Sequence, residues 1–476
     1  MGQTPPGGPG AVFPMLQALA VGQRYRGKQT TAGVVDPLAD DIDAALQQAL
    51  AIYPDSHLTA AITAMMRSRA DTPEAVEAIN RREVQAYLDE AAANGGFNKQ
   101  AALQDAIKVA NRYRIVDMSR QATAELQRMR PSELGLAKVG TTTHVPMHDV
   151  EKWLSQFTYD DWRLGVLRFN STACPTGDKS LLQKTADVIA SQTVFMSVIN
   201  VVKITAEGLP KKTATTPEER LANRIAHVAS GRAGFQGMLL AKALERMSAT
   251  FEIPPEDELA ILLSNKGLAD QRLCSSLAHA FIHFWQGDYD SCVYLIVPRI
   301  EAAARALLRE LDENIFRIEA GKDPGGYIGL YTLLDKLEVL ALDESWCYFL
   351  RWLLVDQFGW NIRNDVAHGL TPNVQAPMAA LVLRAAALLI PIVAPQPTPF
   401  DFEAEDQSGQ TASTACRGRD ELIRLLTNPV PSPVFFPYGH GVEARVRSWA
   451  ADGLLSAAGK LLSLGYWVGR YMPPGQ

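Results

Sequence analysis

Apolar residues recur at helical spacing along almost the whole chain of 476 residues. A spacing of three and four residues places apolar side chains on one face of a helix. The alternation of apolar and polar residues that is typical of strands is hard to find. The sequence therefore predicts an all-α protein. The predicted helices cover residues 36–53, 73–93, 97–130, 147–169, 178–207, 217–250, 255–265, 268–286, 289–318, 330–341, 343–358, 374–394, 418–427 and 441–470.

Helix start signals and proline-rich stretches divide the chain. Thr216 followed by Pro217 is typical of an N-cap and first helical residue. Pro and Gly crowd the N-terminus, and a Pro/Ser/Thr/acidic segment follows the second helical region. The predicted organisation is a flexible tail (1–35), a helical N-terminal domain of unknown role (36–265), a helical bundle (266–394), a Pro-rich linker (395–440) and a C-terminal helix (441–476).

Composition narrows the class of protein. The apolar fraction of 47% and the net charge of −6 are ordinary for a globular chain, which excludes wholesale disorder. The five cysteines form no CxxC pair, which excludes a disulfide scaffold and a cysteine zinc site. Scattered cysteines fit a reducing compartment, so we expect a cytoplasmic protein.

Neither a signal peptide nor a membrane span is predicted. No positive charge precedes the short apolar stretch at the N-terminus. The apolar run 378–395 is interrupted by Arg384 and Pro391, and the run 453–469 carries Lys460. Because a spanning helix needs about 20 apolar residues and a central charge is costly, both runs are interpreted as buried or amphipathic helices.

One histidine pair has zinc-ligand spacing. His279 and His283 lie at positions i and i+4, on one helix face. The string HAFIH has no adjacent Glu and no third ligand, so we favour a packed or hydrogen-bonded pair over a metal site. No metal and no cofactor is predicted.

The segment 359–370 (GWNIRNDVAHGL) carries the strongest functional pattern. Its string RNDVAHG, from Arg363 to Gly369, resembles the Rx4-6H motif of the HEPN superfamily of helical ribonucleases. It is most similar to the RNxxxHG branch, which includes ER-membrane-associated RNA-degradation proteins and bacterial relatives. The resemblance covers residues 266–372. Its other matching segments are Gly287-Asp288-Tyr289, Pro298-Arg299-Ile300-Glu301, Arg305, Leu333-Leu334, Gly359 and Asn361.

The resemblance implies a HEPN-like bundle over 266–394 and an endoribonuclease that acts on RNA without a metal. Family habit further suggests a bacterial toxin or phage-defence effector. Arg363, His368 and Asn364 are the implied catalytic residues. We expect Glu301, Arg305 and Asp365 to support them, with Glu301 and Arg305 paired at i, i+4 along one helix.

Histidine and arginine side chains are suited to cleaving RNA without a metal ion. RNA is cleaved when a 2′-hydroxyl attacks the adjacent phosphate, and histidine is suited to accept or supply a proton near neutral pH. Arginine offers a permanent, planar cation for the charge that develops on the phosphate. The pattern does not decide whether His368 acts as the base or as the acid.

Helix geometry suggests a homodimer. Asn364 and His368 share a helix face, whereas Arg363 is displaced by about 140° from His368. Two motifs that face each other across a twofold axis would bring both groups to one phosphate. The apolar stretch 378–394 is a candidate interface, and packing within the monomer is its competing use.

A non-catalytic reading stays open. Arg363 and His368 would then tie helices together through Glu301 and Asp365, in an adaptor that uses the HEPN-like fold as a scaffold. Residues 266–372 hold 10 basic and 15 acidic residues, which argues against avid RNA binding. A protein partner would then bind through the N-terminal helical region.

Overall fold

The computed structural model confirms the all-α prediction. Most described residues lie in helices, and the strands form only two small two-stranded sheets. The predicted tail 1–35, the predicted helix 441–476 and most of the predicted linker 395–440 lie outside the described residues. The structure describes residues 39–135, 145–158, 161–192, 201–205, 207–265, 267–317, 325–370, 373–395 and 419–427.

The chain forms two compact units, which are described separately. Unit 1 holds the described residues of 1–139 and 204–211. Its hydrophobic side chains gather in two clusters, one over the first two helices and one over the next three. The helices of unit 1 are α2 (Ala39–Ile52), α3 (Ser56–Arg67), α4 (Pro73–Ala93), α5 (Gly96–Tyr113), α6 (Val116–Arg128) and the 3-10 helix η1 (Pro131–Leu134).

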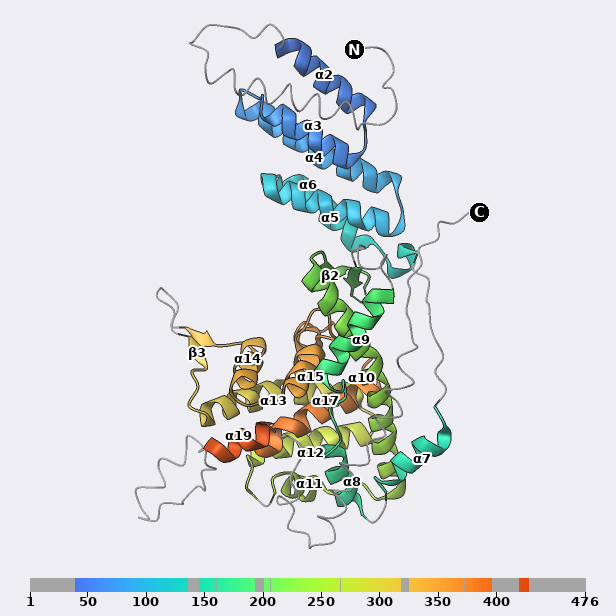
Figure 1. The fold of residues 1–476 in the computed structure, drawn as a ribbon, viewed down its shortest axis with the longest axis vertical. Helices are drawn as coiled ribbons and strands as arrows, with labels where there is room; N and C mark the ends of the chain where they lie inside the picture. Colours follow the sequence, from blue (N-terminus) through green and yellow to red (C-terminus); the bar gives the residue numbers. More distant parts are fainter. Residues whose placement is uncertain are drawn as a thin grey trace. The chain divides into compact units, whose positions relative to one another are not determined.

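Unit 2 holds the described residues of 140–203 and 212–467 and carries the RNDVAHG motif. Figure 1 shows its helices, from α7 onward. They are α7 (Met147–Ser155), α8 (Trp162–Asn170), α9 (Lys179–Gln192), α10 (Pro217–Thr250), α11 (Glu256–Leu263), α12 (Gln271–Trp285), α13 (Tyr289–Glu310), α14 (Leu330–Leu340), α15 (Glu344–Leu354), α16 (Ile362–Ala367), α17 (Ala376–Leu389), the 3-10 helix η3 (Ile390–Ile392) and α19 (Arg419–Thr427). The two sheets pair β1 (Val201–Ile204) with β2 (Pro210–Ala214) and β3 (Phe316–Arg317) with β4 (Gly326–Tyr327).

The division between the units differs from the predicted one. The predicted boundary at residue 265 falls inside unit 2, where one continuous hydrophobic core runs from Trp153 to Leu426. Helices α7 to α11 therefore share a core with the helices that carry the motif. The asparagine and glycine near residue 265 form a turn between α11 and α12, since Gly267 donates its N–H to Ser264 at 3.2 Å.

The predicted start of the long helix α10 is confirmed. The Thr216 side chain accepts a hydrogen bond from the N–H of Glu219, Pro217 is the first helical residue, and the Glu219 carboxylate accepts from the N–H of Thr216. This reciprocal capping satisfies backbone donors that no helical carbonyl reaches. The helix spans residues 217–250, as predicted.

Several predicted helices are interrupted or end early: 147–169 is divided into α7 and α8, and 289–318 ends at Glu310 and is followed by β3. The predicted helix 97–130 is two helices, because Arg114 adopts a left-handed conformation (φ 60°) that ends α5. The predicted helix 178–207 was wrong at residues 201–204, which form β1, while α9 covers Lys179–Gln192 and residues 193–200 lie outside the described residues. Its segment Val201-Val202-Lys203-Ile204 has three β-branched residues in four, which favours a strand.

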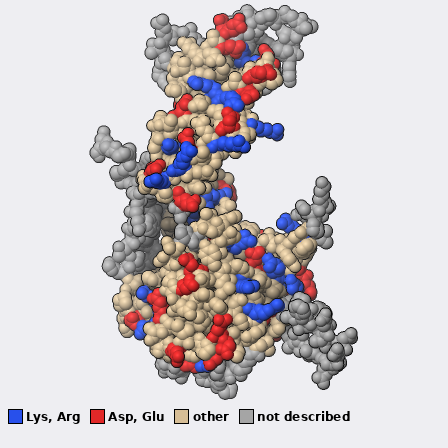
Figure 2. Space-filling view, turned by 180° about the vertical axis from the view of Figure 1, so that it is seen from behind, with Lys and Arg blue, Asp and Glu red and all other residues tan. Residues whose placement is uncertain are grey.

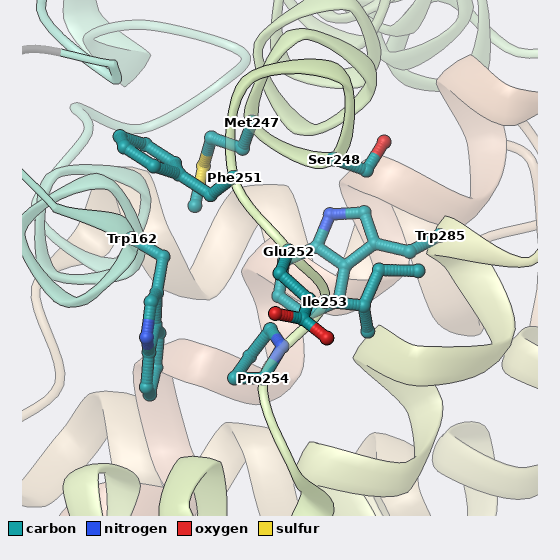
Figure 3. A pocket seen from close by; sticks show the side chains of 8 residues that line it. All are labelled: Trp162, Met247, Ser248, Phe251, Glu252, Ile253, Pro254 and Trp285. Carbon is teal, nitrogen blue, oxygen red and sulfur yellow. The ribbon is translucent and has the colours of Figure 1, made fainter.

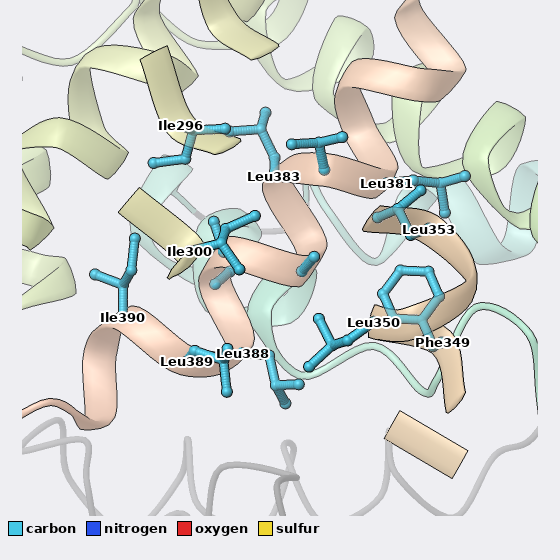
Figure 4. Packing of buried hydrophobic residues seen from close by; sticks show 14 of the residues in the cluster. Ile296, Ile300, Phe349, Leu350, Leu353, Leu381, Leu383, Leu388, Leu389 and Ile390 are labelled. Carbon is cyan, nitrogen blue, oxygen red and sulfur yellow. The ribbon is translucent and has the colours of Figure 1, made fainter. Parts of the chain in front are cut away.

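Helix α17 lies in the core of unit 2. It packs against α8, α10, α12 and α13, and leucine and isoleucine side chains of α13, α15 and α17 fill the space between these helices (Figure 4). Every residue from Ala379 to Leu389 is buried. The prediction that the apolar stretch 378–394 forms a dimer interface is therefore wrong for α17, because packing within the monomer already uses that apolar surface.

Arg384, in the middle of α17, is fully buried. Its guanidinium donates to the carbonyl and hydroxyl oxygens of Thr172, and it lies 4.3 Å from the centre of the Trp346 ring. Loss of water around the charge lowers the pKa of Arg384 to about 9. This charge ties the segment after α8 to the core helix.

The surface carries charges of both signs. On the face shown in Figure 2, lysine and arginine side chains are interspersed with aspartate and glutamate side chains. Among the described helices, none combines the length and the apolar character needed to cross a membrane.

Candidate functional site

A tight turn at Gly359 and Trp360 positions the RNDVAHG motif next to α15. The N–H of Trp360 donates to the carbonyl of Trp352 at 2.9 Å, and the Trp352 and Trp360 rings lie 5.0 Å apart. A Cβ atom at Gly359 would overlap the Trp352 carbonyl oxygen and lie 2.7 Å from its carbon. Only glycine therefore allows this approach of the two backbones.

Asn361 begins the helix that carries the motif. It is buried and adopts a left-handed conformation (φ 58°), which asparagine tolerates better than most residues. Its side-chain oxygen accepts a hydrogen bond of 2.7 Å from Nδ2 of Asn364. This bond fixes the Asn364 amide and turns its own oxygen toward Arg363, whose Nη1 donates to it at 3.3 Å.

The helix that carries the motif ends at Gly369. Gly369 is left-handed (φ 67°), its N–H donates to the carbonyl of Val366, and the N–H of Leu370 donates to that of Asp365 at 2.8 Å. These two bonds form a Schellman motif. His368 is thus the C-cap residue of α16, and it is exposed. Pro372 lies outside the described residues.

Glu301 joins two arginines at the centre of the site. One carboxylate oxygen accepts from Nε of Arg363 at 3.2 Å, and the other accepts from Nη2 of Arg305 at 3.0 Å. The Glu301 side chain is 16% exposed, against 24% for Arg305 and 37% for Arg363. Two guanidinium groups therefore share this one carboxylate, and Arg363 is the more solvent-exposed of the two.

Tyr327 covers the second arginine. The Arg305 guanidinium lies 5.0 Å from the centre of the Tyr327 ring, within the range of a cation–π contact. Tyr327 belongs to β4, which pairs with β3, and both strands follow α13 in the chain. A third element therefore meets α13 and α16 at this site.

The structure brings together four of the six predicted residues. Glu301, Arg305, Arg363 and Asn364 form one hydrogen-bonded chain, so the expected proximity of Glu301 to Arg363 is found. Within the described residues, the His368 side chain makes no hydrogen bond or ion pair with that chain. The N–H of Asp365 donates to the carbonyl of Asn361, and the carbonyl of Asp365 accepts from the N–H of Leu370. The backbone of Asp365 therefore takes part in the first and the last turn of α16.

Sequence reasoning missed two contributors to this geometry. Asn361 was noted only as part of the resemblance, although asparagine is among the residues most often found with a left-handed backbone. Tyr327 was not singled out. Its contact with Arg305 depends on the fold of the β3–β4 hairpin, which no local sequence pattern predicted.

The two histidines pack against each other as tilted rings, and each ring lies close to a carboxylate. The His279 and His283 rings lie 4.7 Å apart, and their Nδ1 atoms approach Glu256 and Asp288 at 3.1 and 3.3 Å. In the described part of the chain, no group of three or more His, Cys, Asp and Glu side chains is arranged to hold a metal ion.

An apolar hollow lies elsewhere in unit 2. Trp162, Phe251 and Trp285 line it, together with residues at the end of α10 (Figure 3). Its empty space of about 170 Å³ includes open solvent and is below the range usual for small-molecule sites. We find no titratable pair in it that would support chemistry.

Comparisons with family models, with curated proteins and with solved structures find no match to this chain.

Proposed function

We propose that the chain is a metal-independent endoribonuclease whose active site contains Arg363, His368 and Asn364. The observation that carries this proposal is the shared carboxylate of Glu301, which holds Arg363 in place without neutralising both arginines. A fixed guanidinium with solvent access is what a phosphate in its transition state requires. The resemblance of RNDVAHG to the HEPN motif supports the same assignment.

The reaction uses only groups of the chain and of the RNA. The 2′-hydroxyl oxygen attacks the adjacent phosphorus, and the bond from phosphorus to the 5′-oxygen breaks. The proton of the 2′-hydroxyl goes to a base, and the departing 5′-oxygen gains a proton. His368, exposed at the end of α16, performs one of these transfers. The products carry 2′,3′-cyclic phosphate and 5′-hydroxyl ends.

A homodimer completes the site in this proposal. The Arg363 side chain is held toward α13 by Glu301, while the His368 side chain has no hydrogen bond to that network among the described residues. A second copy would place its own His368 against this arginine. Leu370, which is 44% exposed beside His368, offers apolar surface for that contact in place of the buried α17.

Single substitutions test the roles of the residues. Because Arg363 and His368 act on the same transition state, we expect Arg363→Ala and His368→Ala each to lower cleavage by about 100-fold or more. Arg272→Ala and His148→Ala remove exposed side chains of the same types on α12 and α7, outside the proposed site, so they should cleave as the wild type does. Equal activity of all five proteins would overturn the assignment.

Mixing the two inactive variants tests the dimer. If each site combines Arg363 of one copy with His368 of the other, Arg363→Ala mixed with His368→Ala regains one intact site per heterodimer. Restored cleavage is the expected result. A wild type that stays monomeric and cleaves at full rate would contradict the shared site.

The second candidate is a non-catalytic adaptor. The ion pair between Arg363 and Glu301 favours it, because it also ties α16 to α13 as a purely structural contact would. In that case Arg363→Ala lowers stability and no RNA is cut by the wild type. A cytoplasmic toxin or phage-defence role belongs to the first candidate, and a protein partner on the N-terminal helices belongs to the second.

A further inference from the structure

Two exposed aromatic rings stand next to the arginine pair. Phe316 of β3 and Tyr327 of β4 face each other across the strand pair, with ring centres 5.4 Å apart and planes at 88°. Phe316 is 39% exposed and Tyr327 is 56% exposed. Cross-strand aromatic pairs stabilise a hairpin only modestly, and both of these rings keep more than a third of their surface open to solvent.

The strand alternation sets these rings outward. Ile315 and Ile328, the neighbours of Phe316 and Tyr327, are buried, and the N–H of Ile328 donates to the carbonyl of Ile315 at 3.1 Å. Since successive side chains of a strand point to opposite faces, the isoleucines anchor the hairpin in the core. The aromatic pair is thereby held on the outer face.

The aromatic pair is continuous with the proposed active site. The Tyr327 ring covers the guanidinium of Arg305, whose Nη2 donates to Glu301, and Glu301 in turn holds Arg363. Guanidinium groups can bind the phosphates of an RNA strand, and exposed aromatic rings beside them can stack on its unstacked bases.

A second exposed tyrosine provides an internal comparison. Tyr331 is also 56% exposed and lies over a guanidinium, that of Arg351, at 5.8 Å. Arg351, however, is paired with both Asp335 and Glu338. Its charge is therefore offset by two carboxylates, whereas the Tyr327 ring covers one of two arginines that share a single carboxylate.

We propose that Tyr327 and Phe316 form a stacking platform for a base of single-stranded RNA next to the cleaved phosphate. The inference rests on the proposed function and specifies its substrate as unpaired RNA. In a duplex the bases are stacked on each other and their faces are closed to the platform. The enzyme would therefore bind and cut loops and single strands in preference to paired regions.

Binding to a non-cleaving protein tests the platform. The full chain with His368→Ala is titrated into a short oligouridylate that contains one 2-aminopurine, alone and annealed to its complement. We expect 2-aminopurine emission to be quenched on binding of the single strand, since stacking quenches it, and the duplex to bind more weakly. Adding Tyr327→Leu should weaken single-strand binding roughly tenfold and abolish the quenching.

Matched variants identify the cause. Tyr327→Phe keeps the ring and should bind as the parent does, and Tyr331→Leu removes an equally exposed ring and should also leave binding unchanged. If Tyr327→Leu binds and quenches like its parent while Arg363→Ala weakens binding, the platform is refuted and the proposed function stands. If Tyr327→Leu weakens binding but the wild type cuts no RNA, the platform stands and the nuclease fails. If none of the proteins binds RNA, both are refuted.

Discussion

Replacing Gly359 by alanine should destabilise unit 2 and displace the motif. The added methyl group would overlap the backbone of Trp352, so either α15 or the turn before Asn361 must move. Overpacking of a close contact costs about 1–3 kcal/mol. Loss of the hydrogen bond from Trp360 to Trp352 adds about 0.5–1.5 kcal/mol. We expect the free energy of unfolding to fall by about 2–4 kcal/mol.

Tryptophan fluorescence during urea unfolding measures this change in unit 2 alone. No tryptophan lies in residues 1–139 or 204–211, and the six tryptophans among the described residues all belong to unit 2. The control is Gly234→Ala on α10, where no atom lies within 4 Å of the added methyl group. It should be neutral or stabilise by up to about 1 kcal/mol. A loss at Gly359→Ala of less than about 0.5 kcal/mol would refute the close approach of the two backbones.

Three further predictions follow from other features of the structure. Gly369→Ala has open space but a left-handed backbone, so it should cost about 1–2 kcal/mol in the same urea assay, and Gly369→Asn should cost less. Burial raises the pKa of the thiols of Cys174 (to about 11), Cys274 and Cys347 (each to about 12), and also that of Cys292. In a Cys416→Ser variant, we therefore expect no reaction with a thiol reagent at mildly alkaline pH until the protein is unfolded, and rapid reaction of the native protein would contradict the burial. The hydrogen bond from Lys212, with those from Thr215, lowers the pKa of Glu219 to about 2, so its stabilising effect is complete above about pH 4.5 and is lost as the pH falls through about 2. Urea midpoints of the wild type should consequently drop more steeply over that window than those of Glu219→Gln.

Local signals predicted the helices well and their interruptions poorly. The start of α10 could be predicted because Thr216, Pro217 and Glu219 make their capping contacts within one turn. The break at Arg114 could not, because a left-handed arginine has no local sequence requirement and follows from how α5 and α6 pack. The same holds for α17, whose apolar surface fits a dimer as well as a core until its neighbours are known.

The candidate site was also predictable from the sequence only in part. The resemblance named Glu301, Arg305, Arg363 and Asn364, and the i, i+4 spacing predicted the pairing of Glu301 with Arg305. That one carboxylate serves both arginines depends on the packing of α16 against α13, which are separated by over 50 residues in the chain. The contact between the Tyr327 ring and Arg305 depends on the position of the β3–β4 pair, and sequence spacing alone does not predict that position.

The most direct test of the proposed nuclease is cleavage of single-stranded RNA in the presence of EDTA, with the ends of the products identified. The account predicts that the wild type cuts in EDTA as fast as without it and leaves 2′,3′-cyclic phosphate ends, and that His368→Ala does not cut. Intact RNA after incubation with the wild type, or cleavage that requires a divalent metal ion, would contradict it.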